Sequence, residues 1–96
     1  MTPRFHPAAE LELAAAMRIG ESRAIGLGRD LLGEVERVVA LLCDLPDIGE
    51  RLDHRRRRFS LQRFPFGIIY RVAGDELRIL AIAHRRQRPG YWRSRE

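Results

Sequence analysis

Lysine is absent from this chain, and cysteine and tryptophan occur once each. Because Cys43 has no second thiol to pair with, an intrachain disulfide and a cysteine-based zinc motif are both excluded. No apolar run is long enough to cross a bilayer, and the first residues lack the apolar core of a signal peptide. We therefore expect a cytoplasmic protein with no metal site and no cofactor.

The absence of lysine means that all 18 basic residues are arginine, which indicates a coding bias and makes their positions more informative than their identity. Residues 1–50 hold five arginines against nine acidic residues, whereas residues 51–96 hold 13 arginines against four. The second half, with a net charge of +9, is therefore where we expect an anionic partner or target to bind.

The length and an apolar content of 45% predict one domain, residues 1–96, with a single core. His6-Pro7 is typical of a helix start and predicts a first helix over residues 8–18. Its glutamates, together with Glu21, are interpreted as solvated residues of the polar face. We expect Gly20 and the glycines at 26 and 28 to break the helical pattern. The predicted core face consists of Ala9, Leu13, Ala16 and Met17, and the three glutamates are Glu10, Glu12 and Glu21.

A second helix is predicted over residues 29–44, because Leu31, Val35, Val38 and Leu42 recur at helical spacing. It should end before Leu45-Pro46, since proline disfavours helical geometry in the preceding residue. The two helices then form an antiparallel pair.

The rest of the chain predicts strands over residues 56–64, 66–72 and 77–83, preceded by a brief strand around Phe5. In the last strand, alternation predicts Leu77, Ile79, Ala81 and Ala83 on one face and Leu80 and Ile82 on the other. This strand should be covered on both faces, because both are apolar. The predicted order is (β)ααβββ, an α+β fold with a helical hairpin packed on a small antiparallel sheet.

Cationic and aromatic residues gather directly after this last strand. Guanidinium groups suit phosphate, and aromatic rings offer stacking faces for bases, so the cluster has the chemistry of a nucleic-acid site. The alternative is a solvated, charged tail whose tryptophan packs back on the fold. The members are His84, Arg85, Arg86, Arg88, Tyr91, Trp92 and Arg93.

Short motifs along nearly the whole chain resemble the RelE/ParE superfamily of bacterial toxins. They are His-Pro-Ala-Ala at 6–9, Gly-Leu-Gly at 26–28, Phe-Pro-Phe at 64–66, Ile-Tyr-Arg at 69–71, the stretch at 79–86 and Pro-Gly-Tyr-Trp at 89–92. The resemblance implies the toxin half of a type II toxin–antitoxin pair and the same helical hairpin on a sheet. The charge of the second half favours a cognate antitoxin with an acidic, partly disordered segment.

The superfamily divides by target. RelE-like members cleave messenger RNA in the ribosome. A resemblance to them implies that basic and tyrosine residues late in the chain are catalytic and that arginines on the sheet bind phosphate. ParE-like members poison DNA gyrase and need only a binding surface. The candidate catalytic residues are His84, Arg85, Arg86 and Tyr91, and the candidate nucleic-acid or target-binding residues are Arg56, Arg58, Arg63, Arg88, Trp92 and Arg93.

Arginine and tyrosine side chains titrate far above neutral pH, which weighs against a RelE-like nuclease function. The long helical pair and the tail after the last strand favour the ParE-like function. Whether the protein is an enzyme stays open, and a non-toxic nucleic-acid-binding module is a third hypothesis.

Overall fold

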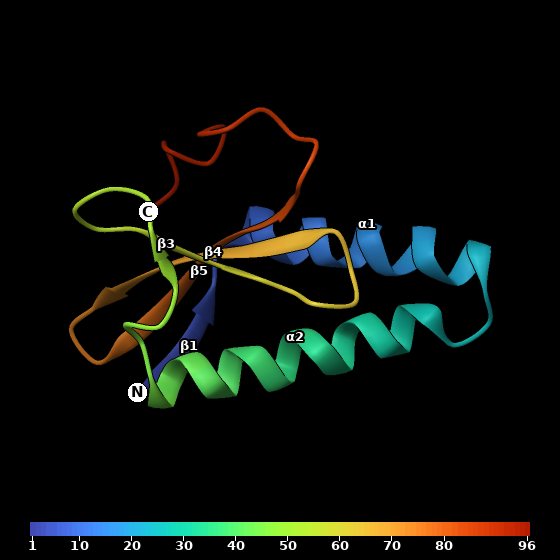
Figure 1. Cartoon of the computed structure of the whole chain (residues 1–96), viewed down its shortest axis with the longest axis horizontal. Coiled ribbons are helices and arrows are strands. Elements are labelled where there is room, and N and C mark those ends of the chain that lie inside the picture. The colour runs from blue at the N-terminus through green and yellow to red at the C-terminus, as the bar shows by residue number, and fades with distance from the viewer.

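Two helices pack on one face of a five-stranded sheet in the computed structural model, which describes all of residues 1–96 (Figure 1). The sheet order is β1-β5-β4-β3-β2, in which β1 runs parallel to β5 and every other pair is antiparallel. This confirms the predicted α+β class and element order. Neither helix has a stretch that is long and apolar enough to span a membrane. The elements are β1 (Thr2–Phe5), α1 (Pro7–Arg23), α2 (Leu27–Asp44), β2 (Glu50–Arg51), β3 (Arg57–Ser60), β4 (Phe66–Ala73) and β5 (Glu76–His84).

Helix α1 starts as predicted but is longer than predicted. The His6 imidazole Nδ1 accepts a hydrogen bond from the Ala8 amide at 3.0 Å, and Pro7 occupies the first turn, where its missing N–H is not needed. Gly20 was expected to break the helix but lies inside it. A Cβ atom at this position would lie 3.6 Å from Leu27 and Gly28 of α2, so Gly20 lies where the two helices are in close contact.

Helix α2 receives its N-terminal cap from the preceding helix. The Glu21 carboxylate accepts hydrogen bonds from the amides of Gly26 and Gly28, at 2.9 and 3.1 Å. Glu21 is exposed, as predicted, but the sequence did not reveal its second role as the cap of α2. These two amide bonds lower the pKa of Glu21, because they stabilise its charged form. The cap compensates for Gly26, which has a φ of 88° and no side chain to cap the helix itself.

The prediction that β5 is buried on both faces is confirmed, but the predicted face assignment is wrong from Ala81 onward. Ile69 of β4 pairs with Ala81 and Tyr70 pairs with Ile79, so Leu80 is an extra residue in β5. This β-bulge reverses the alternation that follows it. Ile82 therefore joins Leu77 and Ile79 on the helix side, while Leu80, Ala81 and Ala83 share the opposite face.

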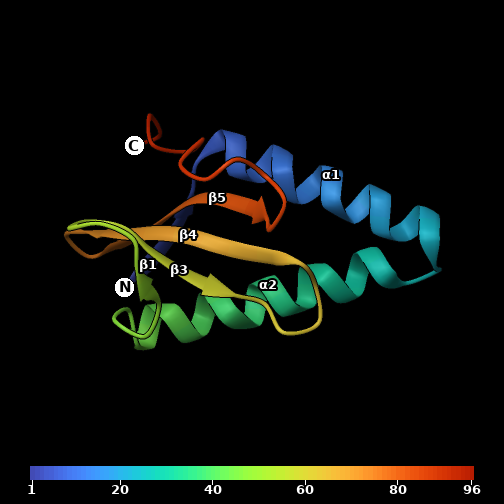
Figure 2. The same ribbon diagram turned by 45° about the horizontal axis from the view of Figure 1, so that its top comes forward.

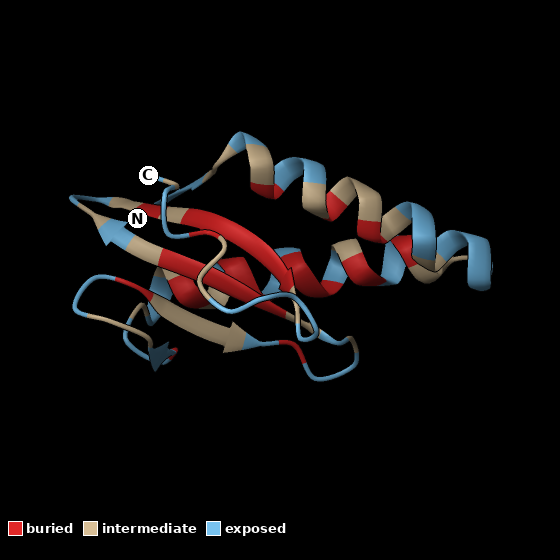
Figure 3. Ribbon diagram, turned by 90° about the horizontal axis from the view of Figure 1, so that it is seen from above, coloured by how far each residue is buried: buried red, intermediate tan, exposed pale blue.

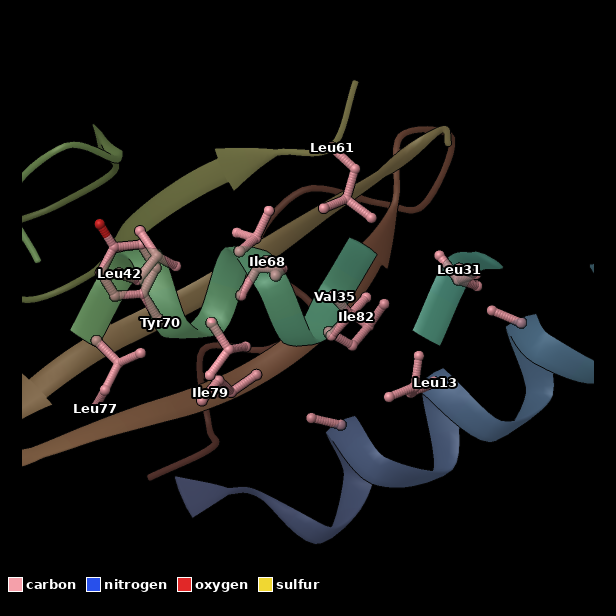
Figure 4. Packing of buried hydrophobic residues seen from close by; sticks show 14 residues of the cluster. Leu13, Leu31, Val35, Leu42, Leu61, Ile68, Tyr70, Leu77, Ile79 and Ile82 are labelled. Atoms are coloured by element: carbon pink, nitrogen blue, oxygen red, sulfur yellow. The ribbon is translucent and has the colours of Figure 1, made fainter. Parts of the chain in front are cut away.

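The main core lies between the helix pair and the sheet. Buried residues run along β4, β5 and the helix sides that face them, whereas the far end of the helical hairpin is exposed (Figure 3). Figure 4 shows α2 side chains reaching toward Ile68, Tyr70 and Ile82 of the sheet. The Tyr70 hydroxyl donates to the Pro46 carbonyl oxygen at 2.7 Å and accepts from the Gly49 amide at 3.0 Å. Tyr70 is fully buried, so these two bonds satisfy its hydroxyl inside the core.

Strand β3 ends at Ser60, so the strand predicted over residues 56–64 was too long. Leu61 turns into the core, and the following segment is bonded to Glu34 of α2. The buried Glu34 carboxylate accepts from the backbone amides of Gln62 and Arg63, at 3.0 and 3.5 Å. These bonds satisfy a charge that would otherwise be costly inside the protein, and they fix the loop before β4.

Candidate functional site

The C-terminal tail, residues 85–96, folds back over the sheet face that the helices leave open (Figure 2). Its first turn is held by two bonds: the His84 amide donates to the Gln87 side chain at 2.8 Å, and the Arg86 amide donates to His84 Nδ1 at 3.0 Å. The His84 ring also meets the edge of Phe66 at 5.2 Å between centroids. The tail therefore leaves β5 through an ordered turn.

Trp92 packs back on the fold, as in the alternative interpretation of the tail. Only 6% of its surface is exposed, and it joins Ile69 and Leu80 in a second apolar cluster. The guanidinium carbons of Arg56 and Arg93 each lie 5.6 Å from the centroid of its ring. The ring is thus not presented to a ligand as a stacking face.

Arg56, predicted as a phosphate binder, is buried and bonded within the protein. It donates from Nη1 to Asp53 Oδ2 at 3.0 Å and from Nη2 to the Arg93 carbonyl oxygen at 2.9 Å. The backbone amide of Arg55 and the bonds from Arg56 lower the pKa of Asp53 to about 2. Because Arg56 ties the tail to the β2–β3 connection, we leave it and Trp92 out of the target surface.

Glu12 of α1 is the second anchor of the tail, and its interpretation as a solvated residue was wrong. One carboxylate oxygen accepts from the Ile82 amide and Arg95 Nη1, both at 2.9 Å. The other accepts from the Tyr91 hydroxyl at 2.9 Å and from Arg95 Nη2 at 3.0 Å. Burial, and then the hydrogen bond to Glu12, raise the pKa of Tyr91, so its hydroxyl stays protonated.

Helical spacing alone could have drawn attention to Glu12. It lies three residues after Ala9 and four before Ala16, both of which are buried, so it borders the core face of α1. Its partner Arg95 carried no such signal, because nothing in the local sequence shows where a tail will dock.

A polar groove of about 470 Å³ brings together three of the predicted arginines. Arg58 comes from β3, Arg63 from the loop before β4, and Arg85 from the turn after β5, and no carboxylate lines the groove. Gly67 leaves space for Arg58, since a Cβ atom there would lie 2.6 Å from its Nε. Arg63 meets Asp30 at 3.6 Å, but both side chains are more than half exposed, so the pair is weak.

The turn after β5 presents further arginines beside this groove. Arg85, Arg86 and Arg88 are exposed, as is Arg93, and none of these four forms a salt bridge. His84, Arg85 and Arg86 lie together at the end of β5, as predicted. The Tyr91 hydroxyl is instead bonded to Glu12 on α1. The arrangement can bind anionic groups, but its tyrosine is already occupied.

An apolar groove of about 730 Å³ lies on a different part of the molecule, between β1 and the two helices. Its charged lining residues are all acidic. No group of three or more His, Cys, Asp or Glu side chains is placed to hold a metal ion. The apolar lining includes Phe5, Leu13, Met17, Val35 and Val39, and the acidic residues are Glu10, Glu36 and Asp44.

A helical hairpin packed on a small sheet is the fold that the resemblance to the RelE/ParE superfamily of toxins implied. The family described as the ParE toxin of the type II toxin-antitoxin system, parDE, matches residues 4–89. The chain therefore belongs to the ParE toxin family. As the toxin of such a system, it has a cognate antitoxin partner.

A solved structure described as the chromosomal ParDE TA system from P. aeruginosa is similar in fold. It is 24% identical in sequence with a TM-score of 0.62, and the match covers 88% of this chain and 95% of that chain. A search of curated protein sequences finds no match.

Proposed function

We propose that this ParE-family toxin acts by binding DNA gyrase through its basic surface rather than by cleaving RNA. The observation that carries this proposal is that the arginines of the tail are exposed whereas its tyrosine is bonded within the protein. Its arginines at 85, 86 and 88 are exposed without acidic partners, while its titratable Tyr91 is bonded to Glu12. Such a surface is suited to binding an acidic protein face or a charged complex.

The bonded tyrosine and the always-charged arginines also weigh against metal-independent RNA cleavage. That reaction needs a base for the 2′-hydroxyl and an acid for the leaving oxygen. The raised pKa of Tyr91 opposes its use as a base, since a group that stays protonated cannot accept a proton. Arginine is protonated at all physiological pH values, so Arg85 and Arg86 cannot take that role either.

The two targets are compared directly with purified toxin. We expect inhibition of gyrase supercoiling and gyrase-linked DNA breaks, and no cleavage of messenger RNA on programmed ribosomes. Cleaved messenger RNA with unaffected gyrase would overturn the proposal. Silence in both assays would instead favour the binding-module hypothesis.

Arg86→Ala tests the surface itself. Arg86 is exposed and only its backbone amide is bonded, so the variant should fold normally. We expect gyrase inhibition to weaken by about tenfold, because a charge at a binding surface is lost. Arg37→Ala, which removes an exposed arginine from α2, is the matched control and should retain full inhibition. Equal inhibition by the two variants would contradict the proposed surface.

We further propose that the antitoxin carries an acidic, partly disordered segment that folds on this basic half. The groove of Arg58, Arg63 and Arg85 has no carboxylate of its own and is suited to receive those of the segment. Apolar anchors of the segment would fit the groove between β1 and the helices. Because the charged residues that line that groove are all acidic, the acidic residues of the segment should lie at the arginine groove and not there.

Charge reversal tests the contact at the arginine groove. The product of a neighbouring gene should co-purify with the toxin, and the complex should weaken with salt. Arg63→Glu places an acid in the arginine groove and should weaken antitoxin binding by about tenfold or more. Arg37→Glu makes the same change on an exposed site of α2. Equal binding by both variants would exclude the arginine groove from the contact.

A further inference from the structure

We infer that Glu12, Tyr91 and Arg95 form a latch that holds the C-terminal tail in the conformation in which the toxin acts. The inference rests on the proposed role of the tail in target binding. It adds three positioning residues, one of which lies on α1, more than 70 residues from its partners in the sequence.

The latch fills an edge of the sheet that β1 leaves open. Strand β1 ends at Phe5, paired with Ile79, and the His6 amide makes the last backbone bond to this edge of β5 at 2.8 Å. Beyond that point, the Ile82 amide donates to Glu12, and the Leu80 carbonyl oxygen accepts from Arg95 at 3.0 Å. Two side chains thus replace the missing strand.

The geometry of the latch is that of a specific contact. Arg95 binds both oxygens of Glu12 through its two terminal nitrogens, and the remaining positions on the carboxylate are taken by Tyr91 and Ile82. The side chains of Arg95 and Glu12 are only 16% and 19% exposed. A bidentate, largely buried arginine–carboxylate pair of this kind is stronger and more directional than a surface ion pair.

The exposed turn lies between two fixed points. His84 belongs to β5, and Tyr91 is bonded to α1, so the intervening arginines are held at both ends. Their like charges repel one another, so without the second anchor the turn would be held less tightly. Holding it in one conformation reduces the entropy lost on target binding. The latch therefore acts on the target through the turn and makes no contact with the target itself.

Trp92 gives a direct readout, because it is the only tryptophan and is buried one residue after Tyr91. Glu12→Gln keeps the shape of the side chain but removes the charge and one acceptor oxygen. We expect Trp92 fluorescence to shift to the red as the tail is released. Growth inhibition on induction should fall about tenfold, the effect of losing roughly 1.4 kcal/mol of binding. Glu50→Gln, at an exposed site of β2 outside both grooves, is the matched control and should change neither.

Arg95→Gln and the double variant Glu12→Gln with Arg95→Gln complete the test. If the two residues act as one latch, the double variant should lose no more activity than either single one. Circular dichroism checks that each variant keeps the helix content of the wild type, and a variant that unfolds is replaced by Tyr91→Phe, which removes only one bond.

Several outcomes overturn the inference. Unchanged Trp92 fluorescence in Glu12→Gln and Arg95→Gln would show that the contacts do not hold the tail. A released tail with full growth inhibition would show that its docking is irrelevant to toxicity. Loss of inhibition in Arg86→Ala but not in Glu12→Gln would refute the latch and leave the surface, whereas the reverse would refute the surface and leave the latch. Growth inhibition is the readout, so the result does not depend on gyrase being the target.

Discussion

Replacing Val38 by aspartate should abolish the folded state. Val38 lies in the middle of the apolar stripe of α2, is 1% exposed and packs in the core between helices and sheet. An aspartate there buries a carboxylate for which no positively charged partner is available in the core. The expected loss is about 4 kcal/mol or more, a large part of the roughly 5–15 kcal/mol that stabilises an average domain. Thermal unfolding followed by circular dichroism measures it.

Ala40→Asp is the control for Val38→Asp. Ala40 lies two residues further along the same helix, on its exposed side. The Ala40→Asp variant introduces the same side chain with the same helix propensity, but at an exposed site. It should therefore lower the melting temperature only slightly. If Val38→Asp melted at the wild-type temperature, the assignment of the core face of α2 would be wrong.

Replacing Gly28 by alanine should be the second large effect on stability. An added Cβ atom would lie 2.6 Å from the backbone carbonyl oxygen of Met17 in α1, a distance that the two helices can relieve only by moving apart. The Gly28 amide also donates to Glu21, so the same movement weakens the cap of α2. We expect a loss of about 1–3 kcal/mol, as for overpacking in a core.

Gly33→Ala in the same helix should have the opposite sign. A Cβ atom at Gly33 meets nothing within 4 Å, so only helix propensity changes. Alanine should stabilise the protein by about 0.5–1 kcal/mol there. At roughly 4–8 °C per kcal/mol for a domain of this size, the two variants should be well separated in melting temperature. A stable Gly28→Ala variant would contradict the close helix contact, and a destabilised Gly33→Ala variant would contradict the open space at Gly33.

The secondary structure could be predicted because the spacing of apolar residues repeats over many positions. The stripe of Leu31, Val35, Val38 and Leu42 identified α2 with its end before Pro46, and His6-Pro7 marked the start of α1. The predictions failed where one residue changes a pattern. The extra residue Leu80 reversed the faces of β5, and Gly20 was tolerated inside α1 because it allows α2 to approach closely.

The candidate site was predictable in part. Composition placed the basic residues in the second half, and the local sequence singled out the arginines and aromatics after β5. The sequence did not distinguish the exposed Arg86 from the buried Arg56, because both are arginines near the ends of strands. Burial of an arginine depends on whether the fold supplies partners, here Asp53 and the Arg93 carbonyl oxygen.

The sequence by itself determined the helices, the main strands and the charge of each half, because these follow from periodicity and composition within short segments. Only the tertiary structure decided which charges remain free. Glu12 and Arg95 are 83 residues apart, and each resembles any other surface residue in its local sequence. They meet because β1 ends early and leaves an edge of β5 whose amide and carbonyl groups require partners. That requirement exists only once the sheet has formed.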